Sequence, residues 1–184
     1  MGIYIDENLT WNKHIEHLKN GIVPLIGILY KIRNWISINY LKNIYFSLVY
    51  SKIQYLISIW GSAVKNKIEP LNKIQNKIIK CIYKLPLLEP TINLYKPKGL
   101  LNISNLYKLK VCTLIHSILI KEKSSNIILT RVNEIHKHDT RQLINLKTLN
   151  FKTTFRKKSV LCKDIYSGGQ KYGNFLFLKV TFFQ

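Results

Sequence analysis

LKNIYFSLVYSKIQYLISIW, residues 41–60, is the longest mainly apolar run of the sequence, and Gly61 closes it. Two lysines, Lys42 and Lys52, interrupt the run. A membrane-spanning helix needs roughly 20 residues that are nearly free of charge. We therefore interpret the run as the buried centre of a helical domain, against which the neighbouring helices pack. No transmembrane segment is predicted.

An amphipathic helix is predicted before this run. From Trp11 to Ile32, apolar residues recur three or four positions apart, which is the spacing of one helix face. Thr10 is the expected N-cap, because its hydroxyl can accept a hydrogen bond from a free backbone N–H. Gly21 and Pro24 fall inside the pattern and predict a kink or a break.

Further helices are predicted within and after the run. From Tyr50 to Trp60 the chain either continues its helix or restarts after a bend. A helix then begins near residues 68–70 and ends at Leu85, before Pro86. A loop containing proline and glycine leads to a last helix that begins at Ile103, capped by Asn102 or Ser104, because both residue types favour the N-cap position.

The predicted fold class is all-α, a small helical bundle. Residues 2–6 alternate weakly in polarity and predict a short N-terminal strand remnant. We place the helical domain over residues 1–122. Residues 123–184 are expected to form a basic, irregular and partly disordered C-terminal extension, because helical periodicity is lost there.

The charge balance indicates the kind of partner. The chain has 29 Lys+Arg against 9 Asp+Glu, a formal net charge of +20. Such an excess favours a polyanion, either a nucleic acid or an anionic membrane surface. Apolar residues make up 47% of the chain, so it is not a disordered polyelectrolyte. An AT-rich genome that favours codons for lysine, asparagine, isoleucine and tyrosine is the alternative origin of the excess.

No catalytic or metal site is predicted. The three aspartates, Asp6, Asp139 and Asp164, are far apart, whereas two-magnesium sites need clustered carboxylates. Asp6 is expected to place favourable charge ahead of the first helix. His14 and His17 lack a third ligand and the His-Glu-x-x-His spacing, so we interpret both as surface histidines. No cofactor is expected.

The three cysteines predict the compartment. They form no Cys-x-x-Cys pair, so neither a zinc knuckle nor a disulfide framework is indicated, and free cysteine is typical of a reducing, intracellular compartment.

Basic residues form the candidate binding site. Lys73, Lys77, Lys80 and Lys84 fall within an arc of roughly 60° on an ideal helix. Ammonium groups in a row suit phosphate contacts, although an ordinary solvated helix face would have the same composition. Four later residues would extend the basic surface: Arg141, Arg156, Lys157 and Lys158.

Several motifs, in order, resemble non-LTR retrotransposon reverse transcriptases, jockey-like enzymes in particular. The first is GIYIDENLTW over residues 2–11, followed by His14-Ile15. The others are GILYKIR over 27–33, Tyr45 with Ser47-Leu48, Tyr55 with Trp60-Gly61, IQNK over 74–77, NLYK over 105–108, and His136 with Thr140-Arg141-Gln142.

In that family these motifs lie just after the palm, in the helical thumb and the connection beyond it. The resemblance therefore implies a thumb-like bundle that contacts the template–primer duplex of an RNA-directed DNA polymerase. The family's catalytic Ala-Asp-Asp motif lies upstream of this segment, so no polymerase activity is expected of this chain alone. Met1 stands where the family has leucine, and the sequence departs from the family's pattern from Asp164 onward. Both differences predict a fragment, with a frameshifted or misjoined tail.

The predicted function is non-specific binding to the backbone of RNA, DNA or an RNA–DNA hybrid. Two alternatives stay open: a translated pseudogene remnant without activity, and a basic protein that binds a membrane surface. The retrotransposon resemblance and the basic charge suggest the nucleus as the intracellular location.

Overall fold

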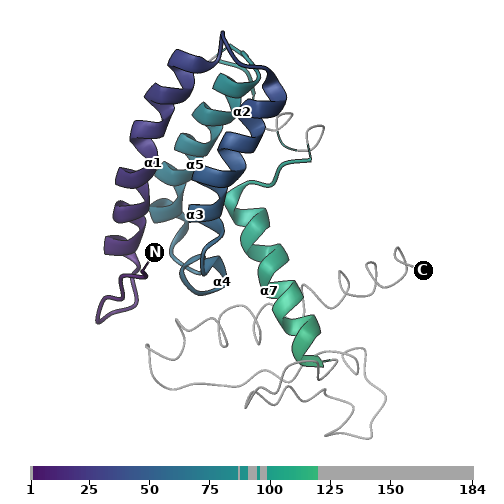
Figure 1. Ribbon diagram of the computed structural model, residues 1–184. Coiled ribbons are helices and arrows are strands. Elements are labelled where there is room, and N and C mark those ends of the chain that lie inside the picture. Colours follow the sequence, from purple (N-terminus) through teal and green to yellow (C-terminus); the bar gives the residue numbers. More distant parts are fainter. Residues whose placement is uncertain (1, 87, 91–94, 96–98, 120–184) are drawn as a thin grey trace, which may run out of the picture. The chain divides into compact units, whose positions relative to one another are not determined.

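A computed structural model describes residues 2–86, 88–90, 95 and 99–119 (Figure 1). Most of these residues are helical and none is in a strand, which confirms the all-α prediction. The chain divides into two compact units, Met1–Tyr107 and Lys108–Gln184. The predicted domain boundary, between residues 122 and 123, lies outside the described residues.

Three helical segments lie side by side in the first unit. In Figure 1, α1 and α5 run side by side and contact each other, and α2 also contacts α5, on the side away from α1. The helical elements of the described chain are α1 (Asn12–Ile32), α2 (Ile38–Ile44), the π-helix η1 (Tyr45–Tyr50), α3 (Ser51–Gln54), α4 (Ile57–Trp60), α5 (Lys65–Ile82) and α7 (Ile103–Leu119).

The apolar run buries only one side in the first unit, so the prediction of a buried centre holds for that side alone, and the apolar residues of its other side are exposed: Phe46, Leu48, Tyr55, Leu56 and Ile59. Its buried residues are four positions apart until the last, and they are Leu41, Tyr45, Val49, Ile53, Ile57 and Trp60. On an ideal α-helix, every fourth residue drifts by about 40° per step. The wider turn of a π-helix takes more residues. Placing η1 in the middle of the run reduces this drift and keeps one side of the segment buried.

A bend at residues 55–56 interrupts the run, so the helix restarts rather than continues. Leu56 has a φ of 48° in the left-handed region, which ends α3. The indole Nε1 of Trp60 donates a hydrogen bond of 2.9 Å to the carbonyl oxygen of Tyr55. This bond gives a buried ring nitrogen its partner and fixes α4 against the bend.

The segment before α1 forms a turn, so the predicted N-terminal strand is wrong. The carboxylate of Asp6 accepts hydrogen bonds from the backbone N–H groups of Thr10 (2.9 Å) and Trp11 (2.8 Å), and from the Thr10 hydroxyl. Thr10 is therefore not the N-cap, and α1 begins after Trp11, whose φ is 64°. The side chain of Trp11 is buried, which offsets the strain of that conformation.

Helix α1 passes through Gly21 and Pro24 without a break. A proline inside a helix lacks the N–H that would donate one backbone hydrogen bond. Pro24 and Gly21 are both exposed, so water can hydrogen-bond the backbone carbonyl that this missing donor leaves free. The Lys52 ammonium group on α3 donates a hydrogen bond of 3.2 Å to the carbonyl oxygen of Gly21. Lys52 therefore links the central run to α1.

A buried amide joins three parts of the unit. The Gln75 side chain on α5 is fully buried, and its Nε2 donates to the Tyr45 hydroxyl and to the Leu101 carbonyl, both at 2.9 Å. Burial raises the pKa of Tyr45 to about 12, so its phenol stays neutral. The loop then leads to α7, where Asn102 caps the helix through a 2.8 Å bond from the Asn105 N–H, one of the two predicted caps.

Candidate nucleic-acid interface

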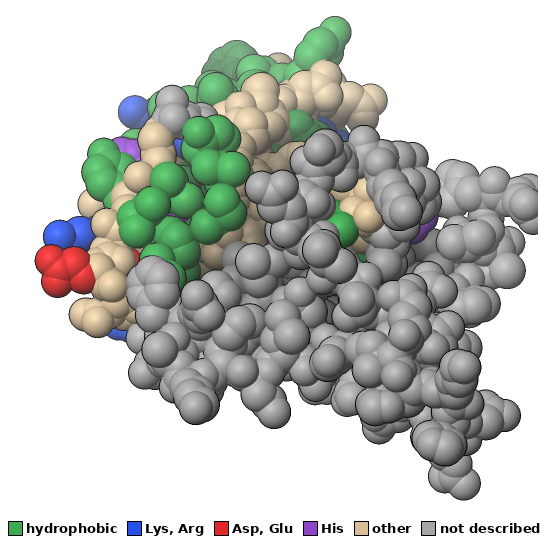
Figure 2. All heavy atoms as spheres, turned by 90° about the horizontal axis from the view of Figure 1, so that it is seen from below, with side chains coloured by type: hydrophobic (Ala, Val, Ile, Leu, Met, Phe, Trp, Pro, Cys, Tyr) green, Lys and Arg blue, Asp and Glu red, His purple; other side chains and the backbone are tan. Residues whose placement is uncertain are grey.

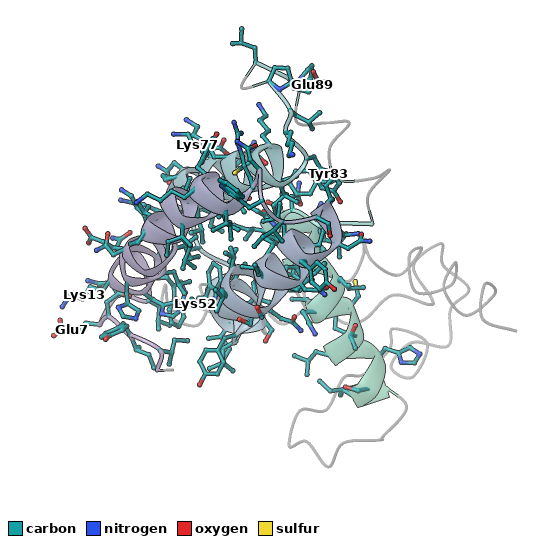
Figure 3. All side chains as sticks on the ribbon, turned by 45° about the horizontal axis from the view of Figure 1, so that its top comes forward. Glu7, Lys13, Lys52, Lys77, Tyr83 and Glu89 are labelled. Atoms are coloured by element: carbon teal, nitrogen blue, oxygen red, sulfur yellow. The ribbon has the colours of Figure 1, made fainter. Side chains whose placement is uncertain are left out.

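The outer side of α5 carries the first candidate residues. Ile74 and Ile78 face the core, and the helix places Lys73 and Lys77 on its exposed side. Figure 3 shows Lys77 pointing away from the bundle, at the upper end of α5. These two ammonium groups are one helical turn apart, so both can contact phosphates of the same strand.

The other two predicted lysines do not continue this row. Lys80 is only 9% exposed, so its ammonium group is not freely available on the surface. Lys84 follows the end of α5 with a φ of 54°, in the left-handed conformation. The predicted four-lysine face is therefore wrong as an exposed row. It reduces to Lys73 and Lys77 on the helix, with Lys84 exposed beyond it.

The end of α5 explains the position of Lys84. The Leu85 N–H donates to the Lys80 carbonyl (2.9 Å) and the Lys84 N–H to the Cys81 carbonyl (3.2 Å). These two hydrogen bonds, together with the left-handed conformation of Lys84, form the Schellman motif that ends many helices. Helix α5 therefore ends at Ile82, three residues before the predicted end at Leu85.

Helix α1 adds lysines that the sequence interpretation did not select. Lys13, Lys19 and Lys31 are exposed on it, and Figure 3 shows Lys13 pointing outward near the start of the helix. A signal was present for Lys31, because residues 17–68 contain no aspartate or glutamate, whereas Glu16 lies three residues from both Lys13 and Lys19. Lys31 therefore has no acidic neighbour in the sequence to neutralise it, and its field favours an anionic partner.

The lower end of the first unit differs in character. Figure 2, seen from below, shows hydrophobic side chains gathered on this face, with acidic side chains at its margin. Tyr4 and Ile5 are exposed large apolar residues of the N-terminal segment, and Glu7 is labelled beside it in Figure 3. This end is a poorer phosphate surface than the rest of α1 and α5.

The two histidines of α1 differ, and the surface prediction is wrong for His14. That side chain is 1% exposed, and its ring lies 5.7 Å from the Trp60 ring in an edge-on arrangement. Neither ring nitrogen has a hydrogen-bond partner in the described part of the chain. Burial, with a smaller effect of His17, lowers the pKa of His14, so it is neutral at pH 7. His17 is exposed, as predicted, with its ring 4.7 Å from that of Tyr4.

The described residues form neither a metal site nor a membrane-spanning helix. Among the described residues, no three or more His, Cys, Asp or Glu side chains come together as a metal site. No helix in that range is long and apolar enough to cross a membrane. The remaining predicted binding residues, Arg141, Arg156, Lys157 and Lys158, lie outside the described residues.

Comparison of the chain with protein-family models, with curated proteins and with solved structures gave no match. The case for a binding surface therefore depends on the exposed charges of α1 and α5 and on the motifs described above.

Proposed function

We propose that this chain binds the phosphate backbone of RNA or of an RNA–DNA hybrid without sequence preference. The single observation that carries the proposal is the exposed lysine surface of α1 and α5, in a chain of net charge +20. Lysine contacts to phosphate release condensed counterions, which gives affinity that does not depend on base sequence and falls steeply with salt.

The motif resemblance adds the class of nucleic acid. A thumb-like segment of a reverse transcriptase would contact a template–primer duplex, and an all-α bundle is compatible with that role. A partner of this kind implies an intracellular site of action, and the resemblance favours the nucleus.

The test is fluorescence anisotropy with a labelled RNA–DNA hybrid across a salt series. Replacing Lys73 and Lys77 together by glutamine should weaken binding and reduce the slope of log affinity against log salt by about 2, roughly 1 per phosphate contact. The Lys73→Arg, Lys77→Arg variant keeps both charges and should keep the slope. Unchanged affinity and slope in the glutamine variant would refute the assignment of these lysines.

A membrane surface is the second candidate partner, favoured by one observation. Val23 and Ile28 are exposed apolar residues on the same helix as Lys19 and Lys31. A helix with lysines and apolar residues on its surface can lie in the membrane interface. Sedimentation with anionic liposomes, absent with neutral ones, would support this alternative, and absence from both pellets would exclude it.

The pseudogene-remnant alternative concerns the fold rather than the partner. A chain without a selected function is expected to have marginal stability and a broad melt. The buried run of the first unit leads us to expect a cooperative transition instead. A thermal melt of the purified chain distinguishes the two, because a broad, non-cooperative curve would favour the remnant.

A further inference from the structure

The turn between α1 and α2 exposes a large aromatic side chain. Trp35 is 89% exposed, whereas the other two tryptophans, Trp11 and Trp60, are buried. The backbone beneath it is hydrogen-bonded, because the N–H groups of Trp35 and Ile36 both donate to the Ile32 carbonyl, at 3.0 and 3.2 Å. A fixed backbone that presents an exposed indole is unusual, since an exposed ring of this size forgoes the free energy of burial.

Cationic and aromatic groups surround this tryptophan in the sequence. The half-buried Arg33 guanidinium lies over the Tyr30 ring, 4.7 Å from its centroid, in a cation–π arrangement, and it also interacts with the Cys81 thiol of α5. Lys31 is exposed on the last turn of α1, and Tyr40 is exposed on α2. The turn therefore combines flat faces for stacking with positive charge for phosphate.

This combination favours a nucleic acid over an apolar partner. An apolar protein surface would gain from the Trp35 indole but would have to desolvate the exposed Lys31 charge next to it in sequence. A single strand offers an unpaired base for the indole and a phosphate for Lys31. Bases inside a duplex are stacked on each other and do not present their faces in this way.

We propose that the α1–α2 turn is a stacking site for single-stranded nucleic acid, in which an unpaired base stacks on Trp35 while Lys31, four residues before it, contacts an adjacent phosphate. The inference rests on the proposed function and refines it. The lysines of α1 and α5 bind the phosphate backbone of any nucleic acid, whereas Trp35 stacks on unpaired bases only. Stacking of this kind tolerates any base, so no sequence preference is expected.

The tryptophan itself provides the probe. With Trp11 and Trp60 buried, the solvent-exposed part of the emission comes from Trp35. Titration of the full chain with an oligothymidylate single strand should quench this emission, and Trp35→Phe should remove the quenching. Trp35→Ala should weaken single-strand binding roughly 5- to 150-fold, the effect of losing one stacked base. Affinity for a blunt RNA–DNA hybrid should stay unchanged in the same variant.

Two controls separate the possible outcomes. Tyr4→Ala removes an exposed aromatic ring near the start of α1 and should not change single-strand affinity. Since Trp35 is exposed, its replacement should leave the thermal melt unchanged, which confirms that the variant is folded. If the Trp35→Ala variant binds the single strand as the natural sequence does, the stacking site is refuted while hybrid binding stands.

Two further results would overturn the inference. Failure of the natural sequence to bind the hybrid at low salt would remove the proposed function itself, and the stacking site with it. Loss of anionic-liposome sedimentation in Trp35→Ala, with single-strand binding intact, would assign Trp35 to a membrane surface instead.

Discussion

Replacing the buried His14 by leucine should stabilise the protein. His14 is almost fully buried, and both of its ring nitrogens lack a hydrogen-bond partner in the described part of the chain. Leaving a buried polar group unsatisfied costs about 1–3 kcal/mol. The edge-on contact with Trp60, lost in the variant, contributes about 0.5–1.5 kcal/mol. The difference predicts a net gain of about 1 kcal/mol for a side chain of similar size, and a rise in melting temperature of about 3 °C.

The same variant should change how stability depends on pH. The pKa of His14 in the folded protein is below its usual 6.5, so the unfolded state binds the proton more tightly. The stability that the natural sequence has above pH 6.5 is therefore lost as the pH falls from 6.5 toward the lower folded value. His14→Leu should lack this component of the acid sensitivity.

Urea denaturation followed by circular dichroism at pH 7.5 and pH 5.5 measures both effects. His17→Gln is the matched control, because His17 is exposed on the same helix and its loss should change stability by less than about 0.5 kcal/mol. A clear loss of stability in His14→Leu, with an unchanged pH dependence, would show that the His14 nitrogens are satisfied in solution, and the reasoning would be refuted.

Three further predictions test the fold by thermal or urea denaturation. Gly61→Ala should destabilise the protein by about 1–3 kcal/mol, because the added methyl would lie 2.5 Å from the Ile57 carbonyl oxygen. Gly27→Ala is the control: open space surrounds Gly27 in the interior of α1, so this change should stabilise the protein by about 0.5–1 kcal/mol. Equal effects of the two changes would contradict the packing around Gly61. Gln75→Leu loses two hydrogen bonds worth about 1 kcal/mol each, but it also removes the buried Oε1, which has no hydrogen-bond partner in the described part of the chain and costs about 1–3 kcal/mol. The two effects oppose each other, so stability should change by less than about 1 kcal/mol, and a loss well above about 2 kcal/mol would show that Oε1 has a partner in solution. Asp6→Ala should cost about 2 kcal/mol near neutral pH, since hydrogen bonds to a charged group are lost. The pKa of Asp6 is lowered, chiefly by the Thr10 hydroxyl, so the natural sequence should lose this stability as the pH falls below about 3.8, and Asp6→Ala should lose none of it there.

The central run shows what the sequence could predict. Its length and its apolar composition, with only two lysines, predict a buried helical segment, and Leu41, Tyr45 and Val49 of this run lie in the core. The sequence leaves open whether the helix bends between Tyr50 and Trp60, because helical periodicity does not contain the contact of the Trp60 indole with the Tyr55 carbonyl that accompanies the bend at Leu56.

The site was predicted less well, for identifiable reasons. His14 lies three residues after Trp11 and four before Leu18, so its position on the apolar stripe of α1 indicates burial, whereas the polarity of histidine indicates exposure. The position decides, and His14 is buried. Lys80 is nine residues from the buried Leu71, which places it on the opposite side of an ideal helix. Its burial therefore depends on packing beyond α5 itself.

The end of α5 is a second case in which residue type concealed the structure. Glycine is the usual residue in the left-handed position that follows a helix, and its presence is the common signal for a helix end. A lysine occupies this position at residue 84, so the sequence indicated a longer helix and placed Lys84 on its face.

The most direct test of the account is the salt dependence of hybrid binding by the natural sequence and by the Lys73→Gln, Lys77→Gln variant. The account predicts a linear fall of log affinity with log salt for the natural sequence, and a slope that is smaller by about 2 in the variant. Equal slopes for the two proteins, or no binding by the natural sequence at low salt, would contradict the claim that these helices hold phosphate.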